Sequence, residues 1–483
     1  MVFRNIFGLI VLFAFISCES NIHKQLDNNI LTVHSLMHAI DKIPVKEAYS
    51  PFSKHVFHSP EFPKNFVVIT AGNNIQNAID SLAEIGGGHV ILKSGSHLSR
   101  RIILKSNINL QIDQDAQLVF KNDIDDYLPV VFTRNEGIEL YSLGACIYAN
   151  NARNIAITGK GKIIGPGEGS VRQKTMSHDV IENIVDHHKP VDERIYDGNS
   201  KDFIFPPALI APINCENVLI EGVHLERSAF WNIVPTYCEN VIIRAVSINS
   251  VGIQRGDGID VESSKNVLIE YCTFNTGDDC IAIKAGRGYD GLRVNKPSEN
   301  IIVRYCLAQQ GHGGLTIGSE TAGMVRNVYV HDCVFDGVDV GIRFKTRRPR
   351  GGGGENMLFE NIRMRVVHSA LRWDMLGQAL HVGELADRNH KVSSNILTPK
   401  FQDITIRDVI IEDAADCIKI EGLPESPLEN VVVENIYAVG NNWLKANDVH
   451  GLTINNAFVT VQNKSIDTIN VSGLKLTNVK FEN

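Results

Sequence analysis

Apolar and polar residues alternate along most of the chain in short runs, and many runs begin at an asparagine. Alternation with a period of two in segments rich in Val and Ile predicts β-strands. The runs are NIAITG at Asn154, NVLIEG at Asn217, NVIIRA at Asn240, NVLIEY at Asn266, NIIVRY at Asn300, NVYVHD at Asn327, NMLFEN at Asn356 and NVVVEN at Asn430. Successive starts from Asn217 to Asn356 lie 23, 26, 34, 27 and 29 residues apart. A repeat of this length built from strands predicts an all-β solenoid, a right-handed parallel β-helix with one coil per repeat.

One segment ahead of these repeats has helical periodicity. In NNIQNAIDSLAEIGGG, Ile75, Ile79 and Leu82 share one helical face, and the glycines that follow favour a helix end. The first coil of a β-helix exposes unpaired strand edges, which a short helix can cover. We therefore expect a short N-terminal capping helix.

The N-terminal residues predict export. MVFRNIFGLIVLFAFISC has one early arginine and an apolar stretch too short to span a bilayer, which is typical of a signal peptide over residues 1–18. Its end resembles a bacterial lipobox, in which Cys18 is lipidated. Residues 19–65, which include Pro51, Pro60 and Pro63, are interpreted as a linker and irregular lead-in, and residues 66–483 as a single β-helix domain. The expected location is the periplasm or the outer membrane, with membrane contact only through the lipid anchor.

The composition limits the classes of ligand and binding partner that we expect. The formal net charge of -8 excludes a general nucleic-acid binder, so an anionic ligand would need a local cluster of basic residues. Eight cysteines follow Cys18, and Cys272, Cys306 and Cys333 occupy the same place in successive repeats. This placement favours stacked free cysteines in the core over disulfides. A β-helix of this size needs no partner, so we expect a monomer.

Aligning the repeats on their second apolar strand gives columns of residues that share a face. The inward column is Ile259, Ile281, Leu315, Ile342, Leu371 and Ile418. One residue later, an outward column contains Asp260, Ala282, Thr316, Arg343, Arg372 and Lys419, and two residues further another contains Glu262, Lys284, Gly318, Lys345, Asp374 and Glu421. Because neighbouring strands lie about 4.8 Å apart, this face carries acidic groups on the earlier coils and basic groups on the later ones.

The same registration gathers ionisable residues just before the strands. It places Asp257 over Asp279 and Asp278 over His312. Adjacent carboxylates repel when ionised, so one of them tends to retain its proton. Three carboxylates and an imidazole this close together are suited to general acid and base chemistry.

Four ordered segments carry a family resemblance. RGDGID at 255–260, GDDC at 277–280, GHG at 311–313 and RFK at 343–345 resemble the signature segments of family 28 glycoside hydrolases, the polygalacturonases. The family usually has Asn-Thr-Asp or Asn-Ser-Asp in the first segment, where this chain has Arg255-Gly256-Asp257, and Arg-Ile-Lys in the last. The similarity also extends through PVVFTR, GKGKIIGPG and FWNIVPTY.

The resemblance implies the roles of the site residues. Asp278 would be the general acid, Asp257 and Asp279 would activate a water, and His312 would help to hold the protonation state of the acid. Hydrolysis with inversion generally needs two carboxyl groups roughly 6.5–9.5 Å apart. The resemblance implies no cofactor and no metal.

Basic residues would bind the substrate. The resemblance assigns the galacturonate carboxylate to Arg343 and Lys345, and further positive charge is expected from the residues Lys284, Arg347, Arg348 and Arg372. Arginine pairs bidentately with carboxylates, which favours a uronic-acid polymer such as pectin. GHGGLTIGSE and KTRRPRGG resemble exo-acting bacterial members, and the polar stretch from Glu168 to Phe205 could wall off one end of a groove.

Other functions remain open from the sequence. Within the family, the substrate could be rhamnogalacturonan or xylogalacturonan. A calcium-dependent pectate lyase would also use a β-helix but would leave an unsaturated, ultraviolet-absorbing product. A non-catalytic glycan-binding β-helix protein would tolerate loss of the acids.

Overall fold

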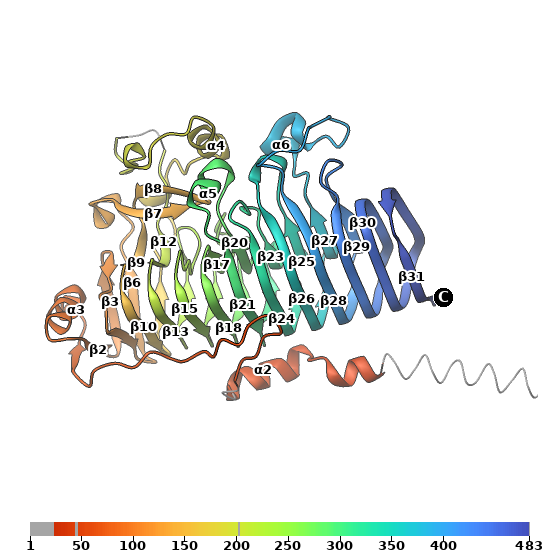
Figure 1. The fold of residues 1–483 in the computed structure, drawn as a ribbon. Helices are drawn as coiled ribbons and strands as arrows, with labels where there is room; N and C mark the ends of the chain where they lie inside the picture. The colour runs from red at the N-terminus through yellow and green to blue at the C-terminus, as the bar shows by residue number, and fades with distance from the viewer. Residues whose placement is uncertain (1–23, 44–46, 201–202, 483) are drawn as a thin grey trace, which may run out of the picture.

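The computed structural model describes residues 24–43, 47–200 and 203–482. Their strands are almost all parallel and wind into an elongated right-handed β-helix (Figure 1). Each coil contributes strands to three parallel sheets that run along the axis of the solenoid. The predicted fold is confirmed.

The first sheet contains the strands that begin near the repeated asparagines. Its members are β1 (Phe66–Ile69), β2 (Gly88–Leu92), β5 (Ile108–Ile112), β10 (Arg153–Gly159), β13 (Glu216–Glu221), β15 (Glu239–Arg244), β18 (Lys265–Glu270), β21 (Ser298–Arg304), β24 (Val325–Asp336), β26 (Gly353–Arg365), β28 (Lys400–Asp413), β30 (Leu428–Ser472) and β31 (Lys475–Phe481). A second sheet follows the first turn of each coil. It contains β3 (Gly95–Ser99), β6 (Ala116–Phe120), β11 (Lys162–Ile164), β14 (His224–Glu226), β16 (Ser247–Asn249), β19 (Thr273–Asn275) and β22 (Leu307–Gln310), and it continues into the distal parts of β24, β26 and β28.

The third sheet carries the predicted columns. Its main strands are β17 (Ile259–Glu262), β20 (Ile281–Lys284), β23 (Gly313–Ile317), β25 (Val340–Lys345), β27 (Ser369–Asp374) and β29 (Asp416–Glu421), preceded by β4 (Ile102–Ile103), β9 (Ala145–Asn150) and β12 (Ala208–Ile213). The observed pairs Ile259↔Ile281, Ile281↔Leu315 and Leu315↔Ile342 reproduce the predicted register. The later pairs Ile342↔Leu371 and Leu371↔Ile418 do so as well.

The interior of the solenoid is apolar. The inward column is almost fully buried, and all eight cysteines after Cys18 are free and buried, as the sequence predicts. Trp373 stacks on Phe344 with ring centroids 4.6 Å apart. Burial of this kind contributes roughly 25 cal/mol for each Å² of apolar surface, so continuous stacking holds the coils together.

The repeated asparagines form a ladder along one corner of the solenoid. Asn266 has a φ of 55° and Asn300 a φ of 57°, a left-handed conformation that Asn tolerates better than most residues. The Nδ2 atom of Asn300 donates to Oδ1 of Asn266 at 3.3 Å, and the pattern continues from coil to coil. At one position Asp403 replaces the asparagine and accepts from Asn430. The asparagine pattern therefore does not mark the start of this coil, although Ile418 of the same coil stands in the predicted inward column.

The predicted capping helix is present. Helix α3 (Ile75–Glu84) buries Ile75, Ile79 and Leu82 against the first coil, and the side chain of Asn74 caps its N-terminus. It lies at the N-terminal end of the solenoid in Figure 1. The strand edges of the first coil are covered as expected.

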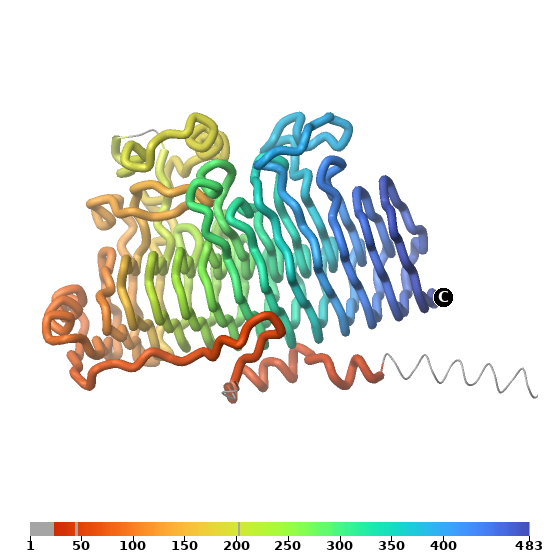
Figure 2. The backbone as a smooth tube through the Cα atoms, in the orientation of Figure 1, coloured from red at the N-terminus to blue at the C-terminus, as the bar shows by residue number. Residues whose placement is uncertain are grey.

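The lead-in is more ordered than the linker expected over residues 19–65. It contains helix α2 (Val33–Lys42), and its later part runs along the outside of the coils towards α3 (Figure 2). Apolar side chains on the outer faces of the first and second sheets explain this difference, because they need a cover. Leu36 packs on Leu307 and Val334, and Phe57 packs against the outer cluster that contains Leu219.

Two groups of insertions rise above the third sheet on the same side of the solenoid (Figure 1). The first comprises the hairpin of β7 (Val131–Asn135) and β8 (Ile138–Ser142), helix α4 (His178–Asp186) and helix α5 (Gly288–Val294). The second contains α6 (Ala379–Val382) and η5 (Gly383–Ala386). Four further 3-10 turns are η1 (Ile124–Tyr127), η2 (Ser170–Arg172), η3 (Val191–Glu193) and η4 (Arg348–Arg350). The predicted signal peptide lies outside the described residues, and no helix within them is long and apolar enough to cross a membrane.

Candidate active site

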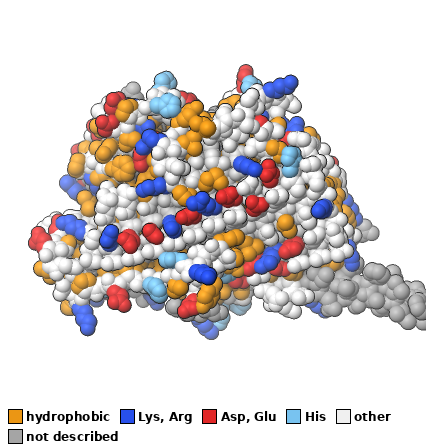
Figure 3. All heavy atoms as spheres, viewed as in Figure 1, with side chains coloured by type: hydrophobic (Ala, Val, Ile, Leu, Met, Phe, Trp, Pro, Cys, Tyr) orange, Lys and Arg blue, Asp and Glu red, His pale blue; other side chains and the backbone are white. Residues whose placement is uncertain are grey.

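A cavity of about 630 Å³ lies over the third sheet between the two groups of insertions. Its floor comes from β20, β25 and β27, while His178 and His381 contribute from the two insertions. Acidic and basic side chains lie close together across this face of the molecule (Figure 3). The basic members of the predicted columns line this groove, whereas the acidic Asp260 and Glu262 of the earlier coils are fully buried and do not line it.

The three predicted carboxylates meet at the edge of this floor. Asp257 precedes β17, and Asp278 and Asp279 precede β20, so the coil register brings one oxygen of each within 4.8 Å of the other two. Only Asp278 opens appreciably into the groove, with 23% of its side chain exposed against 4% for Asp257 and 1% for Asp279. This spacing is shorter than the roughly 6.5–9.5 Å typical of inverting glycosidases, because the coil repeat sets it. The spacing itself does not support inversion.

The local environment shifts the pKa values of the two buried carboxyl groups, Asp257 and Asp279, in opposite directions. Burial, reinforced by Asp260 and Asp278, raises the pKa of Asp257 well above its usual range. Burial also acts to raise the pKa of Asp279, but the charges of Lys345 and Arg343 outweigh it and hold that pKa below the usual range. From the sequence we expect one aspartate of the Asp278–Asp279 pair to retain a proton. The structure instead favours the proton on Asp257, because Lys345 lies 2.9 Å from Asp279 and stabilises its negative charge.

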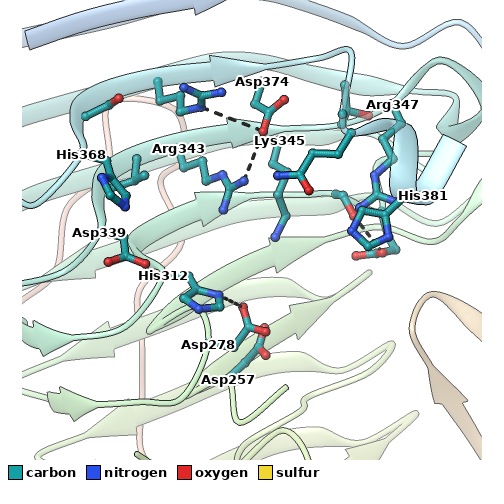
Figure 4. Close-up of a pocket in the computed structure, with 18 of the residues that line it drawn as sticks. Asp257, Asp278, His312, Asp339, Arg343, Lys345, Arg347, His368, Asp374 and His381 are labelled. Atoms are coloured by element: carbon teal, nitrogen blue, oxygen red, sulfur yellow. Dashed lines mark hydrogen bonds and ion pairs between the residues drawn. The ribbon is translucent and has the colours of Figure 1, made fainter. Parts of the chain in front are cut away.

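His312 is placed as the register predicts. Its backbone N–H donates to the carbonyl of Asp278 at 3.0 Å, and Nδ1 lies 3.1 Å from Oδ1 of Asp278 (Figure 4). The hydrogen bond to Asp278 raises the pKa of His312 above its usual value, although partial burial opposes the rise. A protonated His312 would stabilise negative charge on Asp278.

The predicted cations Arg343, Lys345 and Arg372 all line the groove. Each also has an acidic partner: Arg343 contacts Asp374 at 3.2 Å, Lys345 contacts Asp279, and Arg372 contacts Glu421 at 2.8 Å. These pairs fix the direction of the basic groups on the floor of the groove.

Lys284 differs from the expected substrate contact. It is 4% exposed, lies over the ring of Trp231, and its Nζ is 3.6 Å from Asp257 and 3.5 Å from Glu320. Although it borders the cavity, its position makes it a compensating charge beneath the carboxylates rather than a group free to bind substrate.

Arg347 and Arg348 follow β25 and point in different directions. Arg347 lines the groove, as predicted. Arg348 does not: it binds Glu425 at 2.7 Å and the carbonyls of Leu385 and Asp387. The structure therefore places Arg348 away from the groove, because its guanidinium anchors the second insertion.

Several groove residues were missed by sequence reasoning. Trp231 lies in the segment FWNIVPTY, so a signal was available, whereas His178, Glu136 and His381 lie in segments whose positions in space no repeat predicts. The altered Arg255 lines the groove and contacts Glu136 at 3.3 Å. The long polar stretch does reach one end of the groove, through His178 of α4.

A parallel β-helix with clustered carboxylates and cations in one groove defines a β-helical protein equipped for glycoside chemistry. A model described as Glycosyl hydrolases family 28 matches residues 141–440. The chain belongs to this family of glycoside hydrolases.

Individual relatives agree with this assignment. The crystal structure of a hyperthermoactive exopolygalacturonase from Thermotoga maritima is 32% identical, with a TM-score of 0.75 over 83% of this chain and 93% of that chain. A probable polygalacturonase of Vitis vinifera is 26% identical over 75% of this chain and 69% of its own length. An exo-poly-alpha-D-galacturonosidase of Dickeya chrysanthemi is 24% identical over 70% of this chain and 59% of its own length.

Proposed function

We propose that the protein hydrolyses α-linked galacturonic acid residues of pectin, acting from a chain end of polygalacturonate. The observation that carries the proposal is Asp278, which opens into the groove beside the ionised Asp279 and below the cations Arg343 and Lys345. Family membership supplies the reaction class, and the names of the relatives point to polygalacturonate.

The groove residues suggest a separate role for each carboxylate in the reaction. Asp278 donates a proton to the leaving glycosidic oxygen while water attacks the anomeric carbon and the carbon–oxygen bond breaks. Asp279, whose pKa is held low by Lys345 and Arg343 despite its burial, accepts the proton of the water. Asp257 orients that water with Asp279, and Arg343 with Lys345 binds the carboxylate of a galacturonate.

Exo-action follows from the insertions. His178 and His381, one from each insertion, have ring centroids 4.7 Å apart at one end of the groove. A long polymer could not pass through that end, so a chain terminus would have to enter.

Product analysis tests this proposal. Purified protein incubated with polygalacturonate and chelator should release galacturonate monomer alone, and Asp278→Asn should lose at least about 100-fold in rate. Early NMR spectra should show the inverted anomer, as the resemblance implies. A ladder of oligomers would reject exo-action, and a retained anomer would reject inversion. An ultraviolet-absorbing product that forms only when calcium replaces the chelator would favour a lyase.

Export is part of the proposal. The leader and Cys18 favour a lipid-anchored monomer in the periplasm or at the outer membrane of a bacterium. The native protein should fractionate with membranes, whereas Cys18→Ser should become soluble. Equal membrane association of both forms would reject the lipid anchor.

A further inference from the structure

We propose that Asp339 is a positioning residue of the reaction, whose carboxylate supports the positive charge of His312 from the side opposite the proton donor Asp278. This inference rests on the proposed function and deepens it, because it names a residue that sets the pH range in which Asp278 can act. Asp339 lies outside the four sequence segments that carry the family resemblance.

The coil register places Asp339 beside His312. The N–H of His312 donates to the carbonyl of Asp278 at 3.0 Å, and the N–H of Val340 donates to the carbonyl of His312 at 3.1 Å. One coil further, the N–H of His368 donates to the carbonyl of Asp339 at 2.8 Å. Because neighbouring strands lie about 4.8 Å apart, acid and imidazole alternate along this edge of the groove. Asp278 and Asp339 lie on opposite sides of His312 (Figure 4).

Asp339 also differs from the other aspartates that line the groove. Each of the other four has a basic partner, in the pairs Asp257–Lys284, Asp278–His312, Asp374–Arg343 and Asp416–Lys419. The side chain of Asp339 has no ion pair and no hydrogen bond with a residue in the part of the chain that the structure describes. An amide in place of this carboxylate should therefore leave the local packing intact.

The carboxylates around His312 favour its protonated form. The hydrogen bond to Asp278 is the main cause that raises the pKa of His312, and partial burial opposes it. The negative charges of Asp278, Asp279 and Asp339 add to the rise. Asp339 is the member of this group that faces His312 from the following coil.

The other charged groups near His312 are largely compensated. Arg343 and Lys345 of β25 would oppose a positive charge on the imidazole, but they lie 3.2 Å from Asp374 and 2.9 Å from Asp279. His368 is exposed and lies beyond Asp339. The charge of Asp339 is therefore felt mainly by the two imidazoles on either side of it.

This arrangement bears on the proton that the reaction consumes. Asp278 and His312 are in hydrogen-bond contact and titrate as a pair, so one proton must remain on the pair for Asp278 to donate. When Asp278 has given its proton to the leaving oxygen, the charged His312 stabilises the carboxylate that remains. A negative charge at Asp339 keeps the pair protonated to higher pH.

The pH profile of kcat/KM on polygalacturonate tests this role. Asp339→Asn should move the alkaline limb of the profile to lower pH by about 0.3–1 unit, as expected for the loss of one charge near the surface. Asp339→Glu keeps the charge and should keep the limb close to its wild-type position. The difference between wild type and Asp339→Asn should shrink in about 1 M salt, because salt screens the interaction.

Asp336→Asn is the matched control. Asp336 lies three residues earlier on the same coil, outside the groove, with Arg365 at 3.7 Å. Its replacement should leave the alkaline limb unchanged. An alkaline limb that stays in place in Asp339→Asn would overturn the inference, and so would a change confined to KM, which would make Asp339 a substrate contact.

An NMR titration separates failure of this inference from failure of the proposed function. The ring signal of His312, assigned by its loss in His312→Gln, reports the protonation of the imidazole without any turnover. Its midpoint should lie at lower pH in Asp339→Asn than in the wild type, and equal midpoints would overturn the inference. A wild-type protein that shows the expected midpoints but hydrolyses no polygalacturonate would instead reject the proposed function.

Discussion

At the scale of single residues, two buried aspartates of the site differ in pKa because their charged neighbours differ. Asp257 and Asp279 are both buried, yet Lys345 lies 2.9 Å from Asp279 while Asp257 faces Asp260 and Asp278. The pKa of Asp257 is raised and that of Asp279 is lowered, so the cluster holds a proton and an ionised base side by side. One oxygen of Asp257 lies within 4.8 Å of one of Asp278, the proposed general acid, so the cluster can supply the proton that Asp278 donates, while Asp279 is the proposed base.

The His312–Asp278 pair predicts a pH-dependent contribution to stability. Its hydrogen bond raises the pKa of His312 in the folded state, against the effect of burial. The contribution is therefore complete below the unfolded pKa, about 6.5, and declines as pH rises through the higher folded pKa. A double-mutant cycle with His312→Gln and Asp278→Asn, followed by thermal unfolding, should show coupling that weakens as the pH rises above about 6.5.

The single variants provide the control for that cycle. In the Asp278→Asn background, the shift in unfolding temperature caused by His312→Gln should depend less on pH, because only the attraction of Asp279 and Asp339 remains to raise the pKa of His312. Coupling that grows as the pH rises would contradict the assigned direction of the His312 pKa.

At the scale of elements, the coil repeat explains what the sequence could predict. The Asn-led strands give the register, and the register alone places Asp257 beside Asp279 and Asp278 beside His312. The asparagine pattern does not mark the start of the coil at Asp403, because a carboxylate replaces the amide in the same ladder.

The insertions could not be predicted in the same way. Helix α4 and the turn that contains His381 obey no repeat, and their meeting depends on chain segments far apart in sequence. Arg348 illustrates the limit: its neighbour Arg347 lines the groove, and only the partner Glu425 reveals that Arg348 does not. The local sequence shows the charge of such residues but not which way their side chains point.

At the scale of the whole molecule, the N-terminal arm, here residues 24–43 and 47–65, ties distant coils together. Arg363 of β26 donates to the carbonyl of Leu31 at 3.0 Å and contacts Asp27 at 2.7 Å. Further along the arm, Phe57 and Phe62 pack on the outer face of earlier coils. The arm therefore crosses several coils that otherwise contact only their immediate neighbours.

Leu36 offers a test of how far this arm stabilises the solenoid. It is fully buried against Leu307 and Val334, so Leu36→Ala should weaken docking of α2 by about 2–5 kcal/mol. Because α2 lies outside the coils, we expect faster hydrogen exchange in α2 and a lower unfolding temperature while the groove stays intact and activity is kept. Met37, on the same helix and 39% exposed, supplies the control substitution Met37→Ala, which should change neither quantity appreciably. If the two substitutions accelerate exchange in α2 equally, Leu36 does not hold the arm, and the β-helix is stable through its own stacking alone.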